Sequence, residues 1–257
     1  MTGLVVAFSA VLGLLVGSFL NVVIWRYPRG ESLVQPPSHC PSCDTRLTPL
    51  DLVPVLSWLV LRGRCRHCAA RISARYPLVE ALTGLLFGLV AWRFGWRWEL
   101  PAYLFLVAVL VALSFIDLDT KTLPRRIIYL GGAVGVPLLV IAALVADEPR
   151  KIGTAAAGAV CAFAFFLLLH LIAPGSMGFG DVRLSALLGW YLGWLSMLHV
   201  PVGLFLGFVF GAVVGVALMV GGKAGRKTAV PFGPFMAAGA IVAILWGEGL
   251  IDLWLPG

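Results

Sequence analysis

The chain has 257 residues, of which 60% are hydrophobic and 12% charged, and its mean hydropathy is +0.98. Soluble domains average about 45–50% apolar and about 25% charged residues, so this composition excludes an ordinary water-soluble fold and a disordered chain. The net charge of +7 is compatible with nucleic-acid binding, but in a membrane protein it more often comes from basic cytoplasmic loops.

Apolar stretches long enough to cross a bilayer recur along the whole chain. The first, at 3–25, has neither the basic start nor the cleavage site of a signal peptide, so we expect a membrane helix. Seven more follow, at 77–95, 100–116, 127–146, 152–172, 184–199, 201–221 and 231–250. The sequence predicts an all-α polytopic membrane protein with about eight transmembrane helices, divided into a first helix (1–25), a small loop domain (26–76) and a seven-helix membrane domain (77–257).

Basic residues divide unevenly between the two sides of the membrane. The loops after the first, third, fifth and seventh predicted helices hold 15 of the 19 Lys and Arg residues, and eight of these lie in the loop at 26–76. Only Arg93, Arg97, Arg150 and Lys151 fall on the other side. Because basic loops stay on the cytoplasmic side, we expect the large loop in the cytoplasm and both termini outside it.

Two close cysteine pairs stand in the loop, Cys40-Pro-Ser-Cys43 and Cys65-Arg-His-Cys68, with 21 residues between them. Four thiolates from two such pairs form the tetrahedral ligand set of a structural zinc ion, and a cytoplasmic location would keep them reduced. Redox-active pairs and a site without metal remain alternatives. The basic loop has few aromatic side chains for stacking on bases, so we expect no nucleic-acid partner.

Acidic residues cluster at two places that the predicted topology brings to the same depth. Asp117 and Asp119 lie at the cytoplasmic end of the third helix, and Asp181 lies at the start of the sixth. Two neighbouring carboxyl groups share one proton, so that one activates water while the other stays protonated, as in aspartic peptidases. Gly178 and Gly180 would let a helix or a substrate backbone approach closely. Alternatively, these are interfacial charges, with Asp181 capping its helix.

Eight segments along the chain carry a family resemblance: 17–28, the two cysteine pairs, 61–65, 72–80, 115–124, 178–181 and 231–235. Together they resemble the type IV prepilin peptidases, bacterial leader peptidases of the GxGD aspartic class. The resemblance implies catalysis by Asp117 and Asp181, with Asp117 chosen over Asp119 because it lies seven residues before Pro124. The chain departs from the family pattern at Arg125, which stands where Asp or Asn is usual, and at Ser176, which often is Gly.

Two further segments have more than one interpretation. Pro231, Gly233 and Pro234 interrupt the start of the eighth helix, and either leave backbone groups for an extended substrate or simply begin the helix. Glu80 either pairs with Arg75 as a structural contact or, by resemblance, belongs to a methyl-transfer site.

The resemblance implies an aspartic endopeptidase of the bacterial cytoplasmic (inner) membrane that cuts the basic leader of type IV prepilin or pseudopilin substrates at the cytoplasmic face. Relatives with the cysteine-rich loop also methylate the new N-terminus with S-adenosylmethionine. The competing hypotheses are a non-catalytic transporter or channel with a zinc-stapled loop, and a membrane-tethered module that binds nucleic acid. Membrane lipid surrounds the protein in every case, and the sequence indicates no oligomeric state.

Overall fold

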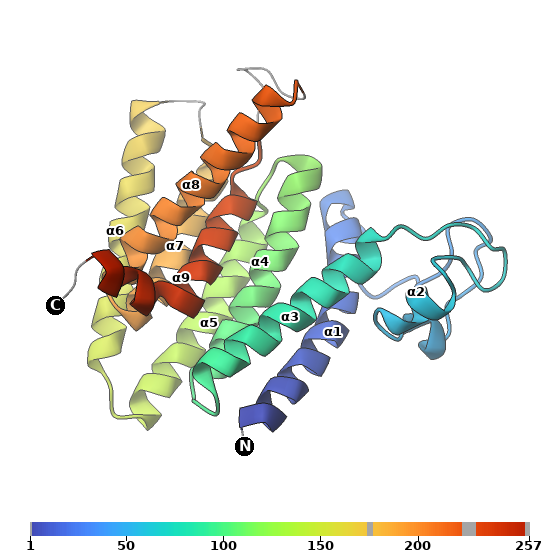
Figure 1. The fold of residues 1–257 in the computed structure, drawn as a ribbon, viewed down its shortest axis with the longest axis horizontal. Helices are drawn as coiled ribbons and strands as arrows, with labels where there is room; N and C mark the ends of the chain where they lie inside the picture. The colour runs from blue at the N-terminus through green and yellow to red at the C-terminus, as the bar shows by residue number, and fades with distance from the viewer. Residues whose placement is uncertain (1, 174–176, 223–229, 255–257) are drawn as a thin grey trace. The chain divides into compact units, whose positions relative to one another are not determined.

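The computed structural model describes residues 2–173, 177–222 and 230–254. In these ranges the regular structure is helical, apart from two isolated β-bridges (Figure 1). The long helices are α1 (Thr2–Arg26), α3 (Arg75–Phe94), α4 (Leu100–Thr120), α5 (Arg125–Val145), α6 (Arg150–Ile172), α7 (Phe179–Leu195), α8 (His199–Val220) and α9 (Gly233–Trp254). The loop after α1 contains two short 3-10 helices, η1 (Tyr27–Arg29) and η2 (Pro49–Leu52), and the five-residue helix α2 (Leu56–Val60).

A long helix overlaps each predicted apolar stretch, which confirms the prediction of an all-α polytopic membrane protein. Seven of the described helices are long and apolar enough to cross a membrane, and α7, with 17 residues, lies at the lower limit of a spanning helix. The sixth helix begins at Phe179 rather than at residue 184. Its start includes the charged residues Asp181 and Arg183, because the Asp181 carboxylate accepts a hydrogen bond from the N-cap amide of Gly178.

By its internal contacts the chain separates into two compact units, Met1–Trp96 and Arg97–Gly257. The first unit consists of α1, the loop and α3, and the second of α4 to α9. The division predicted from composition, at residues 26 and 77, is a different kind of boundary and stays a prediction.

In the first unit, α1 and α3 pack closely through small residues on both helices. A Cβ at Gly13 would lie 2.8 Å from the Phe87 side chain, and one at Gly84 would lie 2.8 Å from Leu14. Because glycine leaves room for the opposite side chain, the two helices come together without a layer of large residues between them.

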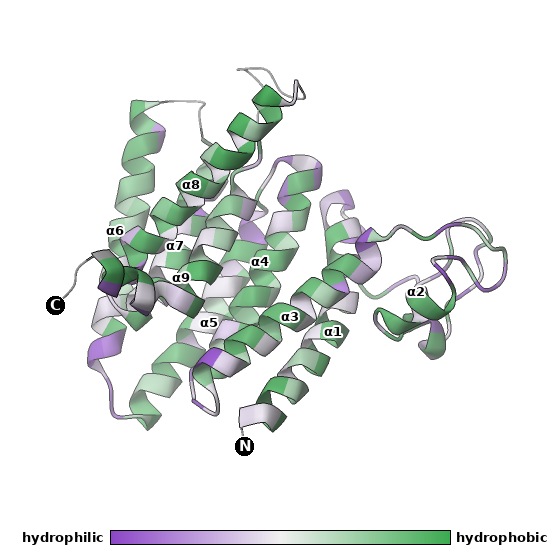
Figure 2. Cartoon of the chain, in the orientation of Figure 1, coloured by the Kyte–Doolittle hydropathy of each residue, from purple (hydrophilic) through white to green (hydrophobic). Residues whose placement is uncertain are grey.

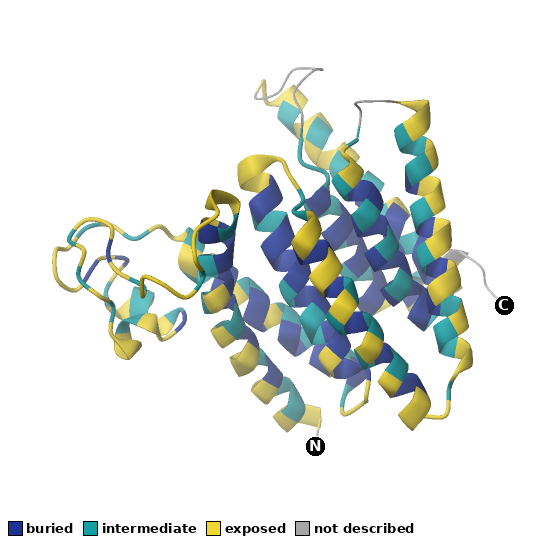
Figure 3. Ribbon diagram, turned by 180° about the vertical axis from the view of Figure 1, so that it is seen from behind, coloured by how far each residue is buried: buried dark blue, intermediate teal, exposed yellow. Residues whose placement is uncertain are grey.

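In the second unit, neighbouring helices form antiparallel pairs, α4 with α5, α6 with α7 and α8 with α9. The carboxyl ends of α4, α6 and α8 therefore lie at the same end of this unit as the amino ends of α5, α7 and α9. Helix α4 is the most buried of the candidate spans, and Figure 3 shows buried faces along the packed helices of the bundle. Inside it, Tyr103 on α4 donates a hydrogen bond to the backbone oxygen of Tyr191 on α7, at 2.8 Å.

Candidate active site

The two carboxylates that the sequence singled out come together at one end of the second unit. Asp117 lies in the last turn of α4 and Asp181 in the first turn of α7, and only 4% and 7% of their surfaces are exposed. The segments around them meet at one side chain, because a Cβ at Gly180 or at Gly233 would lie within 3 Å of Leu123. Asp119, two residues further along, is exposed. The helix thus presents Asp117 to the interior and Asp119 to the surface.

A glycine amide orients each of the two carboxylates. The N–H of Gly233, the first residue of α9, donates to Oδ2 of Asp117 at 3.0 Å. The N–H of Gly178 donates to Oδ2 of Asp181 at 3.2 Å. Hydrogen bonds to a charged acceptor are stronger than those between neutral groups, so these two amides fix the direction of both side chains.

Leu123 fills the space between the two glycine segments. A Cβ at Gly180 would lie 2.8 Å from Cβ of Leu123, and one at Gly233 would lie 2.9 Å from its Cδ2 and 2.8 Å from Asp117 Oδ2. Leu123 reaches this position because α4 ends at Lys121, which has a left-handed backbone with φ of 53° and donates its amide to the Asp117 backbone oxygen. Nothing in the sequence marks Leu123 beyond its place before Pro124.

The prolines of the site lie at or close to the starts of helices. Pro124 is the N-cap of α5, and its carbonyl accepts hydrogen bonds from the Ile127 and Ile128 amides. Pro231 precedes α9, and Pro234 lies in the first turn of α9, where a missing N–H leaves no helical hydrogen bond unmade. Helix α9 starts at Gly233, whose amide donates to Asp117, and the pairing of this segment with an extended substrate stays a prediction.

The four cysteines of the loop form one cluster in the first unit. Their sulfur atoms all lie within 4.8 Å of one another, and Sγ of Cys40 and Cys68 are 3.8 Å apart. Tetrahedral zinc with Zn–S bonds of about 2.3 Å requires sulfur atoms about 3.8 Å apart. The donor set therefore fits a zinc ion bound by Cys40, Cys43, Cys65 and Cys68.

The two cysteine pairs adopt the same local structure. The Asp44 amide donates to the Cys40 carbonyl and the Ala69 amide to the Cys65 carbonyl, and both donor residues have positive φ, 54° and 58°. The isolated bridges, one around each pair, close these turns. Hydrogen bonding to the side chain of Thr45 lowers the pKa of the Cys43 thiol to about 6, which favours the thiolate that a metal requires.

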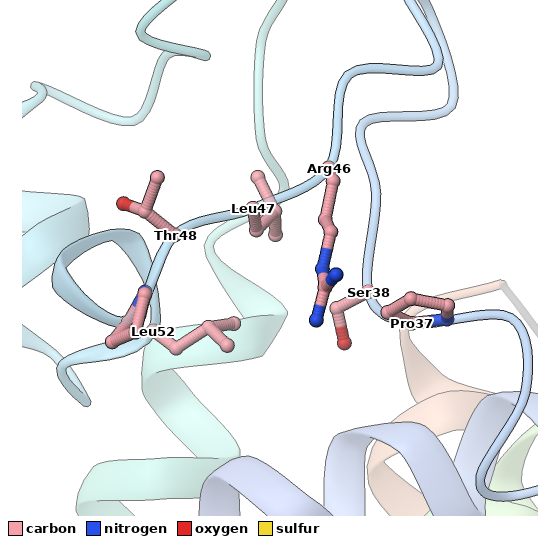
Figure 4. Close-up of a pocket in the computed structure, with 7 residues that line it drawn as sticks. Pro37, Ser38, Arg46, Leu47, Thr48 and Leu52 are labelled. Carbon is pink, nitrogen blue, oxygen red and sulfur yellow. The ribbon is translucent and has the colours of Figure 1, made fainter.

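A cavity of about 340 Å³ lies beside the first cysteine pair (Figure 4). Its lining is mostly aliphatic, with Arg46 as the charged member: Pro37, Ser38, Arg46, Leu47, Thr48, Pro49 and Leu52. Because these residues include no carboxyl group, this cavity does not provide the chemistry of an aspartic peptidase.

Glu80 connects the loop to the membrane helices of the first unit. It is buried in α3, and its Oε2 accepts a hydrogen bond from the Val55 amide at 2.7 Å. Buried Arg26 also donates to two backbone oxygens of the loop, and Asn21 on α1 donates to the Tyr76 carbonyl in the first turn of α3. Glu80 therefore has a structural partner, whatever further role it has.

Comparison with known proteins finds two matches along the chain. Residues 11–94 match the Bacterial Peptidase A24 N-terminal domain, and residues 104–216 match the Type IV leader peptidase family. The first range contains all four clustered cysteines, and the second contains both carboxylates of the buried pair. No solved structure matches the chain.

Curated relatives are similar over nearly the whole chain. A prepilin leader peptidase/N-methyltransferase of Stutzerimonas stutzeri is 36% identical, and the alignment covers 96% of this chain and 92% of that protein. The protein of the same name from Pseudomonas aeruginosa is 35% identical over the same shares. That of Myxococcus xanthus is 44% identical, over 86% of this chain and 65% of its own length.

Proposed function

Because this chain belongs to the type IV leader peptidase family, we propose that Asp117 and Asp181 are the catalytic pair with which it hydrolyses the leader of type IV prepilin-like proteins. As a member of that family it is an enzyme, a prepilin peptidase, and its helices make it a multi-pass protein of the inner membrane. The observation that carries the proposal is the buried pair itself, with each carboxylate held by a glycine amide.

The pair acts as a single acid–base unit in this reaction. One carboxylate takes a proton from the attacking water, and the other, protonated, donates a proton to the oxygen of the scissile carbonyl. The tetrahedral intermediate then collapses: the departing amine takes up the proton held by the first carboxyl group, and a hydroxyl group of the intermediate returns its proton to the second, which restores the pair. Since the glycine amides hold one oxygen of each carboxyl group, the other oxygen is left to bind the water or the shared proton.

The substrate reaches the pair from within the bilayer. A prepilin carries a hydrophobic helix after its basic leader, so the scissile bond would lie at the membrane surface while the helix stays in lipid. This agrees with the place of the pair, in the last turn of α4 and the first turn of α7. A transporter or channel would instead need carboxylates near the middle of the membrane, along a polar path.

Cleavage of a purified prepilin in detergent, followed by mass analysis of the product, tests the assignment. Asp117→Asn and Asp181→Asn should each fold and yet lose activity, because the amide cannot accept the proton of the attacking water. Loss of a general base alone costs roughly 10²–10⁴ in rate. The double variant should be little worse than either single one, since the pair works as a unit. Exposed Asp119 serves as the control, and Asp119→Asn should keep turning over.

Two outcomes would contradict the assignment. If Asp117→Asn cleaves at the wild-type rate while Asp119→Asn is inactive, the catalytic residue of this segment is Asp119. If all three variants cleave normally, the aspartic mechanism is wrong.

We propose that the chain also methylates the amine exposed by cleavage, using S-adenosylmethionine. Support comes from the relatives, which are named prepilin leader peptidase/N-methyltransferase, and from the domain match that spans the cysteine-rich loop. The sequence has no glycine-rich nucleotide fingerprint for this cofactor. Incubating the cleaved product with enzyme and S-adenosylmethionine should add the mass of one methyl group, and an unchanged mass would contradict the proposal.

The loop would face the cytoplasm, with both chain ends outside it. The distribution of Lys and Arg supports this orientation. Residues 255–257 lie outside the described part, so the amino-terminal end is the one to probe. A cysteine at Thr2 should be labelled from outside intact cells and a cysteine at Ser32 should not, and the reverse would overturn the orientation.

A further inference from the structure

Several large aliphatic side chains of the loop are exposed and lie close together in one short segment. Leu50 of η2 and Leu56, Leu59 and Val60 of α2 are all exposed, Val60 with 79% of its surface. We call these four residues the apolar edge. In Figure 2 the hydrophobic colour within the loop is concentrated on α2. Scattered exposed leucines are ordinary, but a gathered set of them on one short segment usually marks an interaction surface.

The segment that carries the apolar edge is fixed in this orientation by its polar and aromatic residues. Asp51 forms an ion pair with Arg66 of the second cysteine pair, with 2.7 Å between Oδ1 and Nε. The Trp58 indole donates to the Ile72 carbonyl at 3.1 Å, and Gly63 packs against its ring. The groups that hold the segment thus face the loop interior, and the aliphatic groups are left on the outside.

The start of α2 lies beside α1 and α3, several residues in from the ends of these helices, rather than beyond their ends. Val55, just before α2, donates its amide to Glu80, which lies five residues, or roughly 7 Å, inside α3 from its start at Arg75. Glu80 in turn packs against Gly17 of α1, nine residues or roughly 13 Å before the end of α1 at Arg26. Arginines at both helix ends mark the membrane surface. By this measure the start of α2, the helix that carries three of the four residues of the apolar edge, lies below that surface.

Arginine residues lie close to the apolar edge along the chain. Residues 26–76 hold eight Arg and three acidic residues, and Arg62, Arg64 and Arg71, which follow α2, are exposed. Aliphatic side chains with neighbouring arginines are typical of protein segments that lie in the interface of an anionic membrane.

We propose that the apolar edge is immersed in the acyl chains of the leaflet on the loop's side of the membrane, while the arginines after α2 bind the phosphates of anionic lipids. The segment 50–60 is then an interfacial element that holds the zinc-binding loop against the bilayer. This proposal is independent of the peptidase reaction, since it concerns the partner of a surface in the first unit.

Photo-crosslinking in the full-length protein tests the proposal. A benzophenone amino acid is placed at Val60 in one variant and at Val34 in another, in nanodiscs of three parts phosphatidylethanolamine to one part phosphatidylglycerol. Val34 is the matched control, because it is also a valine of the same loop and 80% of its surface is exposed. Leu56 offers a second position on the apolar edge. Zinc content shows that each variant is folded, and mass analysis identifies the adducts.

We expect phospholipid adducts at Val60 and Leu56 to be several-fold more abundant than at Val34, with phosphatidylglycerol enriched above its share of the nanodisc lipid. Equal lipid adducts at Val60 and Val34 would overturn the immersion. So would adducts of Val60 to a second copy of the chain or to an added prepilin in place of lipid. An unenriched share of phosphatidylglycerol would overturn the role of the arginines. None of these readouts depends on cleavage, so they hold whether or not the proposed peptidase assignment does.

Discussion

Gly233 is the residue at which the smallest change should cost the most activity. In Gly233→Ala the new Cβ would lie 2.8 Å from Asp117 Oδ2, whereas carbon–oxygen contacts are normally about 3.3 Å or more. The carboxylate must move away, and its 3.0 Å hydrogen bond from the Gly233 amide then lengthens or breaks. A hydrogen bond to a charged group contributes about 1.5–3 kcal/mol. If the transition state loses all of it, the rate falls roughly 10- to 150-fold.

Two controls separate this effect from a general disturbance of α9. Gly249→Ala changes the same residue type in the same helix, and its Cβ would meet nothing within 4 Å, so it should keep wild-type activity. The double variant Gly233→Ala/Leu123→Ala removes the second crowded contact, the one with Leu123 Cδ2 at 2.9 Å. Because the contact with Asp117 remains, this double variant should stay impaired.

Initial rates of prepilin cleavage in detergent, with the melting temperature of each variant measured in parallel, give the result. We expect a lower kcat for Gly233→Ala with a melting temperature near that of the wild type, because alanine is also the better helix former. Full activity in Gly233→Ala would refute the role of this amide in orienting Asp117. Recovery of activity in the double variant would show instead that crowding against Leu123 causes the defect.

The glycines beside Asp181, the cysteine cluster and Glu80 each allow a further test. Gly178→Ala should retain most activity, because its Cβ would lie 3.5 Å from Asp181 Oδ2, an ordinary contact distance. In Gly180→Ala the Cβ would lie 2.8 Å from the Leu123 side chain, so this variant should introduce about 1–3 kcal/mol of strain and lower turnover. Equal rates of the two variants in the cleavage assay would contradict this order. The Cys40→Ser/Cys65→Ser variant should lose its zinc in metal analysis and still cleave, leaving unmethylated product; unchanged zinc content would exclude these ligands. Glu80→Gln keeps a carbonyl oxygen for its loop partner, so methylation by mass analysis should persist, and its loss would favour a chemical role for the carboxylate.

Much of the fold could be predicted because membrane helices follow directly from composition. A stretch such as 152–172 has few alternatives to a spanning helix, and the helix found there is Arg150–Ile172. The start of α7 could not be placed from hydropathy alone, because Asp181 and Arg183 fall outside the apolar stretch at 184–199. The carboxylate of Asp181 is instead part of the cap that starts it. Local polar contacts of this kind carry no weight in a count of apolar residues.

The cluster of four cysteines could be predicted because two Cys-x-x-Cys pairs at this separation are typical of a metal site. The arrangement around the carboxylates could be predicted only in part. Motif and predicted depth single out Asp117 and Asp181, but the Gly233 amide that orients Asp117 is 116 residues away along the chain. Leu123 is an ordinary leucine whose importance comes from the turn at Lys121 and from the two glycines it packs against. Neither contact has a signature in the sequence.

The glycines near the two carboxylates show why a motif does not by itself assign a role to each of its residues. At Gly178 the site uses only the backbone amide, which any residue other than proline would supply. A side chain there would contact Asp181 only at an ordinary distance. Gly180 is there for the space that Leu123 occupies. Gly233 has both duties, since its amide binds Asp117 and its missing side chain leaves room for the same carboxylate. Substitution tolerance should therefore rank Gly178 first, Gly180 second and Gly233 last, an order that follows from atomic distances and not from the pattern of letters.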